Sequence, residues 1–145
     1  NINFSSYKTI LLANGVLQYA EANNKEEALD IPIGMIDSGK NIYAYYYWLF
    51  PNIMLNFYSW GLSINIIEPI NKNKTRIRFL SYPVHNRTQA KELNSSLDKV
   101  EKEDQEIVKR VQLGLKSSFY NRGRYSPKYE SGVHHFHKLI CKSLN

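Results

Sequence analysis

The chain has 145 residues, of which 43% are hydrophobic and 22% charged, with a formal net charge of +6 and a single cysteine. This length is enough for one domain with a buried core, and the composition excludes an intrinsically disordered chain. One cysteine excludes an intramolecular disulfide and an iron–sulfur cluster held by this chain alone, and it favours an intracellular, cytoplasmic protein. The basic residues are dispersed and no apolar run approaches a membrane span, so we expect neither a nucleic-acid nor a membrane partner.

The first 41 residues predict little regular structure. Residues 1–15 are expected to form a short helix or loop, and residues 15–22, GVLQYAEA, to form a strand. The polar segment that follows carries two turn signals, Pro32-Ile33-Gly34 and Asp37-Ser38-Gly39.

Four strands are predicted next, at residues 42–50, 52–60, 62–69 and 75–84. They are rich in aromatic and β-branched residues, and the last two alternate apolar and polar side chains over most of their length. The links between them are short, and short links join antiparallel neighbours, so the strands are expected to form a meander.

A long helix is predicted from residues 95–96, where a serine can cap its N-terminus, to Leu115. Apolar residues recur along it with helical spacing, but one position is missing from this stripe. It lies four residues after Val100 and four before Val108, and Asp104 occupies it.

A carboxylate on a buried helix face costs several kcal/mol unless something compensates for it. A basic side chain could pair with Asp104, burial could raise its pKa so that it is protonated, or it could bind a cation. The pattern alone leaves all three alternatives open, and a paired or half-exposed aspartate is more common than a metal ligand.

Residues 116–132 are expected to be irregular, and residues 133–144 to form a short final helix. Its expected apolar stripe consists of Val133, Phe136, Ile140 and Leu144. His137 is predicted to lie on this stripe, and His134 and His135 to lean away from it. Together the elements predict an α+β fold in which one long helix lies across a curved antiparallel sheet, with a cavity between them.

Four stretches carry a resemblance to a known family: YYYWLFPNIMLNFYSWGLSINIIEP, TRIRFLSYPV, LDKVEKEDQEIVKRVQLGL and GRYSPKYESGVHHFHKL. Between about Tyr43 and Leu139, the chain resembles the catalytic domain of the α subunit of Rieske-type ring-hydroxylating oxygenases. The resemblance implies a helix-grip, START-like sheet and helix. It also implies an enzyme that uses O₂ to mono- or dihydroxylate a small, aromatic or apolar substrate.

The same resemblance implies two metal cofactors in the intact subunit. One is a mononuclear Fe(II) held by two histidines and one carboxylate, and the other is a [2Fe–2S] Rieske cluster that receives electrons from NAD(P)H through a reductase or ferredoxin. In the family the carboxylate belongs to the long helix, in a stretch that matches Glu103, Asp104 and Gln112 here. The resemblance therefore implies Asp104 as the iron ligand and catalytic residue, with Glu103 as the second choice.

The chain departs from the family pattern in its histidines and cysteines. It has no His-x4-His pair and no set of Rieske ligands. We therefore interpret residues 1–145 as the C-terminal portion of the catalytic domain of a larger subunit, inactive by itself. The family implies a homo-oligomer, commonly a trimer, and the histidines at 134, 135 and 137 are interpreted as structural.

Inward-facing strand residues are expected to form the walls of a substrate pocket. The candidates are Met54 or Leu55, Phe57 and Ile64, with the aromatic run Tyr45–Tyr47 nearby. The alternative function is a metal-free module of the same fold that binds a small apolar ligand.

Overall fold

The computed structural model describes residues 2–84 and 102–145. The chain forms two compact units, one of residues 1–84 together with 126–145, and one of residues 85–125. The first unit contains the sheet, and the second contains the helix of residues 102–115.

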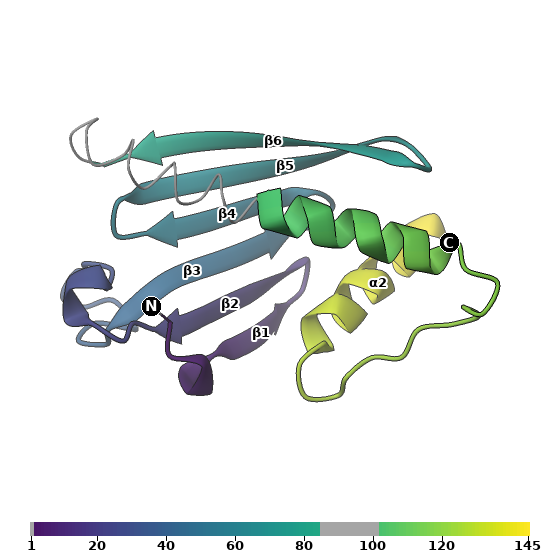
Figure 1. Cartoon of the computed structure of the whole chain (residues 1–145). Coiled ribbons are helices and arrows are strands. Elements are labelled where there is room, and N and C mark those ends of the chain that lie inside the picture. The colour runs from purple at the N-terminus through teal and green to yellow at the C-terminus, as the bar shows by residue number, and fades with distance from the viewer. Residues whose placement is uncertain (1, 85–101) are drawn as a thin grey trace. The chain divides into compact units, whose positions relative to one another are not determined.

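The first unit is built around a six-stranded antiparallel sheet whose strands follow one another in the order of the sequence (Figure 1). The strands are β1 (Lys8–Leu12), β2 (Gly15–Glu21), β3 (Ile42–Leu49), β4 (Ile53–Tyr58), β5 (Gly61–Asn71) and β6 (Lys74–Pro83). One helix, α2 (Ser131–Leu144), and two short 3₁₀ helices, η1 (Phe4–Ser6) and η2 (Lys25–Glu27), complete the described secondary structure of this unit. The α+β class, the antiparallel meander and the strand β2 are thus confirmed.

The expectation of a helix or loop at residues 1–15 was wrong for one segment, because residues 8–12 form the edge strand β1. β1 and β2 make a hairpin in which Leu12 pairs with Gly15. Gly15 leaves no room for a side chain, since a Cβ there would collide with the carbonyl oxygen of Trp48. Five residues are too few to show a periodicity, so the glycine after a two-residue turn was the only local signal of this hairpin.

The pairing register divides the side chains between two faces of the sheet. Tyr47, Leu55 and Ile64 are paired across β3, β4 and β5 and therefore share one face. Trp48 and Met54 are paired with each other on the opposite face, and α2 packs on that side. We call the face that carries Tyr47, Leu55 and Ile64 the open face, and the face that carries Trp48 and Met54 the α2 face.

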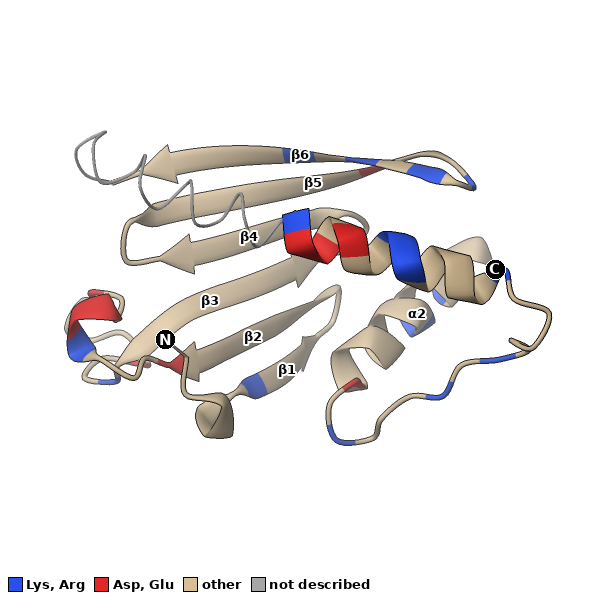
Figure 2. Ribbon diagram, in the orientation of Figure 1, with Lys and Arg blue, Asp and Glu red and all other residues tan. Residues whose placement is uncertain are grey.

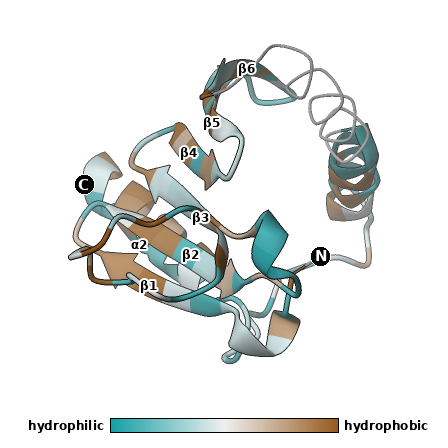
Figure 3. Ribbon diagram, turned by 90° about the vertical axis from the view of Figure 1, so that its left-hand side faces the viewer, coloured by the Kyte–Doolittle hydropathy of each residue, from teal (hydrophilic) through white to brown (hydrophobic). Residues whose placement is uncertain are grey.

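The fully covered core is small and lies where β2 and β3 meet. Its hydrophobic members are Val16, Ala20, Ile42 and Ala44. The alanines pair with each other across the two strands. Apolar residues also occur along β1 and α2 (Figure 3), although Ile10 and Leu11 of β1 are 43% and 49% exposed. Small residues in the centre leave the larger aromatic side chains to line the two faces.

The predicted stripe of α2 was correct for Phe136 and Ile140 and wrong for Val133 and Leu144. Gly132, His135, Phe136, Leu139 and Ile140 are the partly buried residues, whereas the side chains of Val133 and Leu144 are 45% and 82% exposed. His137 is exposed and His135 faces the sheet, the reverse of the expectation. The cause is Gly132, which lets the helix approach so closely that an added Cβ would lie 3.3 Å from a methyl group of Val16.

The second unit contains the helix of residues 102–115, followed by an irregular segment, as predicted for residues 116–125. The predicted start of this helix at residues 95–96 lies outside the described residues. Along the helix, Glu106 is 3.5 Å from Arg110 and 4.0 Å from Lys109, which are i,i+4 and i,i+3 ion pairs on its exposed surface.

Candidate active site

Asp104 lies in the helix of residues 102–115, one turn before Val108. Its side chain is exposed, and no ion pair or hydrogen bond engages it among the residues that the structure describes. Ile107, Val108 and Val111 are each more than half exposed, so the described residues of this unit do not cover the apolar stripe of the helix. A pairing of Asp104 with a basic side chain is therefore not seen in the described part of the chain.

The residues of this chain do not fit a complete iron site. In the ranges 2–84 and 102–145, no three His, Cys, Asp or Glu side chains gather closely enough to hold a metal ion. A facial triad needs two histidines in addition to one carboxylate. The chain can thus offer one ligand of such a site, and Asp104 stays a prediction.

The C-terminal histidines are explained by packing and by surface position. The His135 ring nitrogen Nε2 lies 2.8 Å from the carbonyl oxygen of Leu12, at the end of β1. This contact ties α2 to the edge strand. His134 and His137 are exposed on the same helix. These positions support the structural interpretation of the histidine cluster.

A hollow of about 440 Å³ lies on the open face of the sheet. Five residues line it: Tyr45, Tyr47, Leu49, Leu55 and Phe57. We call it the aromatic pocket. The rings of Tyr47 and Phe57 meet edge to face, with centroids 6.0 Å apart and planes at 82°. The strands that carry it, β3 and β4, contain no Lys, Arg, Asp or Glu (Figure 2).

The aromatic pocket contains most of the expected wall residues. Leu55, Phe57, Tyr45 and Tyr47 come together in it, and Ile64 lies on the same face beside Leu55. Met54 lies on the α2 face, so the structure selects Leu55 from the predicted pair. Side chains two residues apart on a strand share a face, which is why Leu55 and not Met54 accompanies Phe57.

The turn before β3 is fastened to the wall of the aromatic pocket. The Tyr45 hydroxyl donates a hydrogen bond to Asp37 Oδ2 (2.6 Å), and Lys40 Nζ donates to Asp37 Oδ1 (2.6 Å). Hydrogen bonds from Lys40 and Tyr45 lower the pKa of Asp37, whereas burial and the bond to Asp37 raise the pKa of Tyr45. Gly34 and Gly39, with φ of 94° and 83°, allow the chain to turn on either side of Asp37.

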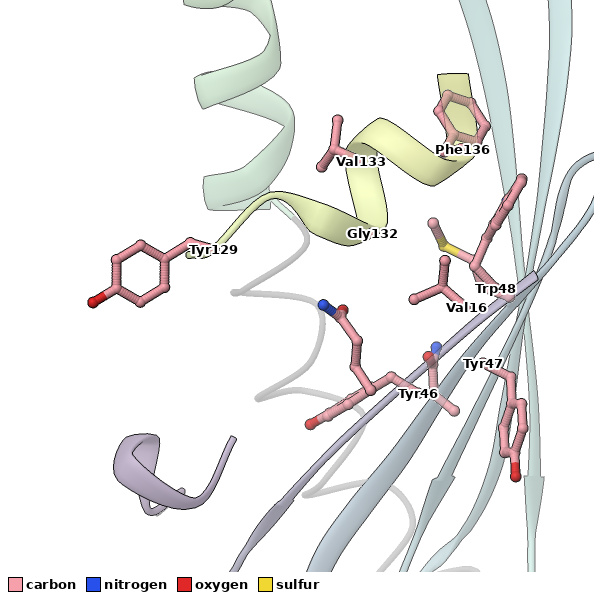
Figure 4. Close-up of a pocket in the computed structure, with 11 residues that line it drawn as sticks. Val16, Tyr46, Tyr47, Trp48, Tyr129, Gly132, Val133 and Phe136 are labelled. Atoms are coloured by element: carbon pink, nitrogen blue, oxygen red, sulfur yellow. The ribbon is translucent and has the colours of Figure 1, made fainter. Parts of the chain in front are cut away.

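A second cavity, of about 300 Å³, lies between α2 and the sheet on the α2 face (Figure 4). Its lining comes from β2, β3, β4, α2 and the residue Tyr129. The rings of Trp48 and Phe136 meet edge to face at 4.7 Å, and burial raises the pKa of Tyr46 strongly. This cavity was not predictable from the sequence, because the orientation of α2 about its axis depends on the close approach at Gly132.

A membrane span is not found among the described residues, because none of their helices is both long and apolar enough to cross a bilayer.

Comparison with known families identifies the class of protein. The family model described as the ring hydroxylating alpha subunit (catalytic domain) matches residues 19–144. The chain therefore belongs to this family. The match spans β3 to β6, the helix of residues 102–115 and α2, so it covers both the aromatic pocket and Asp104.

Curated relatives make the comparison more specific. The chain is 31% identical over 150 residues to the chloroplastic choline monooxygenase of Amaranthus tricolor and 28% identical over 148 residues to that of Spinacia oleracea. Each alignment covers 99% of this chain and 32% of the relative. The chain thus spans about a third of the length of these relatives. Their names place those proteins in the chloroplast, a compartment that our expectation of a cytoplasmic protein did not include.

A solved structure agrees on the fold. The quaternary ammonium Rieske monooxygenase CntA, in complex with the inhibitor MMV12, superposes with a TM-score of 0.71 at 20% sequence identity. The superposition covers 97% of this chain and 39% of that one. The fold is therefore that of a Rieske oxygenase catalytic domain.

Proposed function

We propose that this chain is the C-terminal part of the catalytic domain of a Rieske monooxygenase, and that the intact subunit uses O₂ to hydroxylate a small quaternary ammonium compound. The observation that carries the proposal is the family match over residues 19–144, which contains the aromatic pocket. The names of the choline monooxygenases and of CntA support monooxygenation over dioxygenation and a quaternary ammonium substrate over an aromatic hydrocarbon.

The chemistry of the aromatic pocket supports this substrate class. A quaternary ammonium ion has no N–H to donate, so it is recognised by ring faces and apolar contacts rather than by hydrogen bonds. Tyr45, Tyr47 and Phe57 supply the rings, and Leu49 and Leu55 supply aliphatic surface that displaces water. The wall carries no formal charge, which suits a ligand with a diffuse, weakly hydrated cation.

We propose Asp104 as the carboxylate ligand of the mononuclear iron, with the two histidine ligands contributed from outside this sequence. Its position in the stripe of the helix and the family match support this assignment. When bound, such an iron would supply O₂ activation at the positions that the three protein ligands leave open. The intact subunit would also require the [2Fe–2S] Rieske cluster, electrons from NAD(P)H through a reductase, and a homo-oligomeric, trimeric assembly.

The proposal is tested on the full-length subunit, reconstituted with iron, its cluster and a reductase. We expect O₂-dependent oxidation of choline with a kcat/KM at least about tenfold above that of 3,3-dimethylbutan-1-ol, its uncharged carbon isostere, because cation–π contacts favour the charged compound. Loss of this preference, with oxidation of uncharged aromatics instead, would contradict the substrate class. Absence of any O₂-dependent turnover, with binding of apolar ligands, would favour the metal-free module.

A paired substitution ties the preference to the aromatic pocket. Tyr47→Leu should lower kcat/KM for choline about fivefold more than for the isostere, because it removes one ring from the wall. Tyr82→Leu is the matched control, since Tyr82 lies on the same face but on β6, outside the lining of the pocket. An equal effect of both substitutions would contradict the placement of the substrate.

A further inference from the structure

Tyr45 is held at two points. Its ring lies against Tyr19, with centroids 5.7 Å apart, and its hydroxyl donates to Asp37 at 2.6 Å. The hydroxyl contact connects a wall residue of the aromatic pocket to the turn of residues 34–40, eight residues earlier in the chain. A hydrogen bond to an ionised carboxylate is short and roughly twice as strong as a neutral one, so it can fix a single orientation of the ring.

Lys40 balances the negative charge of the Asp37 carboxylate. Its ammonium group lies 2.6 Å from the second oxygen of Asp37, and the Asp37 side chain is only 14% exposed, against 48% for Lys40. The ion pair of Asp37 and Lys40 therefore contributes almost no net charge to the aromatic pocket. A carboxylate that bound the substrate cation directly would compete with this lysine for the same oxygens. Asp37 is better placed to hold Tyr45 than to contact a ligand.

We propose that Asp37 is a positioning residue for substrate recognition: it fixes Tyr45 in the wall of the aromatic pocket, so that the turn of residues 34–40 determines the specificity of the enzyme. This inference rests on the proposed function, because it treats the aromatic pocket as the substrate site. We call the hydrogen bond from the Tyr45 hydroxyl to Asp37 the anchor. The role of Lys40 is to balance the negative charge of Asp37, so that the ring faces select the substrate.

Substitutions of Asp37, Tyr45 and Lys40 are expected to have different effects on KM. Asp37→Ala and Tyr45→Phe each break the same hydrogen bond, so each should raise KM for choline about fivefold with kcat within a factor of two, and the double variant should be no worse than either single one. Lys40→Met leaves the hydrogen bond in place and removes the balancing charge, so KM for choline should stay the same or fall. The KM for the uncharged isostere should rise less than the KM for choline in Asp37→Ala, in Tyr45→Phe and in the double variant, because the ring faces attract the charged compound more strongly.

The experiment measures KM and kcat of the full-length holoenzyme for both compounds in the wild type and these variants. Additive effects of Asp37→Ala and Tyr45→Phe, or equal effects on choline and its isostere, would overturn the inference. A rise of KM in Lys40→Met as large as in Asp37→Ala would overturn it as well, because the ion pair and not the hydrogen bond would then be decisive.

Hydrogen exchange separates this inference from the proposed function. The amides of residues 34–40 should exchange faster in Asp37→Ala and in Tyr45→Phe than in the wild type, whatever the substrate of the enzyme is. If the wild type oxidises no quaternary ammonium compound, the proposed substrate is wrong while faster exchange still supports the anchor. If exchange in this turn is unchanged in both variants, the anchor itself is refuted.

Discussion

At the scale of single residues, the ionisation of Asp37 depends on its contacts. Lys40 and Tyr45 both donate to its carboxylate, and these hydrogen bonds lower its pKa below the ordinary value of 3.8. A carboxyl group with a lowered pKa stabilises the fold above its ordinary pKa, and this contribution is lost as the pH falls through the lowered value. The anchor should therefore work at neutral pH and weaken in acid.

Chemical denaturation at two pH values tests this linkage. Asp37→Ala should lower the free energy of unfolding at pH 7, and the difference from the wild type should shrink as the pH is lowered below 3.8, since the wild-type carboxyl then becomes protonated too. Asp30→Ala serves as the control, because Asp30 is exposed in the same segment and the Tyr45 hydroxyl donates to Asp37 instead. A difference that stays constant with pH would show that ionisation of Asp37 is not involved.

Asp104 and Asp37 differ in how far the sequence could predict them. The gap in the apolar stripe made Asp104 a candidate ligand, because helical periodicity acts over neighbouring turns and can be read locally, and this assignment stays a prediction. Asp37 was recognised only as part of a turn signal, since its role depends on where β3 places Tyr45. Asp37 and Tyr45 are brought together by the fold of the turn and β3, so no local sequence pattern indicates their hydrogen bond.

At the scale of elements, α2 shows how a helix takes its orientation from one small residue. Gly132 brings the helix backbone against β1 and β2, and this approach fixes which side chains face the sheet. The four strands β3 to β6 were predictable because they are rich in aromatic and β-branched residues and because short links join antiparallel neighbours. The phase of α2 was not, because several apolar stripes one residue apart fit its sequence equally well.

The contact between Phe136 and Trp48 should be the main attachment of α2. Phe136→Ala should lower the free energy of unfolding by about 2 kcal/mol, less than for a fully buried phenylalanine because the side chain is only partly covered. Leu144→Ala, at a position that is 82% exposed on the same helix, should change it by less than about 0.5 kcal/mol. Urea unfolding of both variants compares them directly, and equal effects would contradict the observed orientation of α2.

At the scale of the whole molecule, the chain supplies two separate parts of a proposed oxygenase site. The sheet unit carries the aromatic pocket, and the unit of residues 85–125 carries Asp104. We expect neither part to be an enzyme by itself, because one carboxylate does not hold iron and an apolar wall does not activate O₂. The family match covers both parts, and the chain spans about a third of the length of the choline monooxygenases that it resembles.

Iron content of the full-length subunit tests the central claim most directly. We predict that Asp104→Ala loses the mononuclear iron while the Rieske cluster, followed by its visible absorption, stays intact. Glu106→Ala is the matched control, because Glu106 is exposed on the same helix and pairs with Arg110, and Glu103→Ala tests the neighbouring carboxylate. Loss of that iron in Asp104→Ala alone, together with loss of substrate oxidation, is the predicted result. Full iron occupancy in Asp104→Ala would contradict the account.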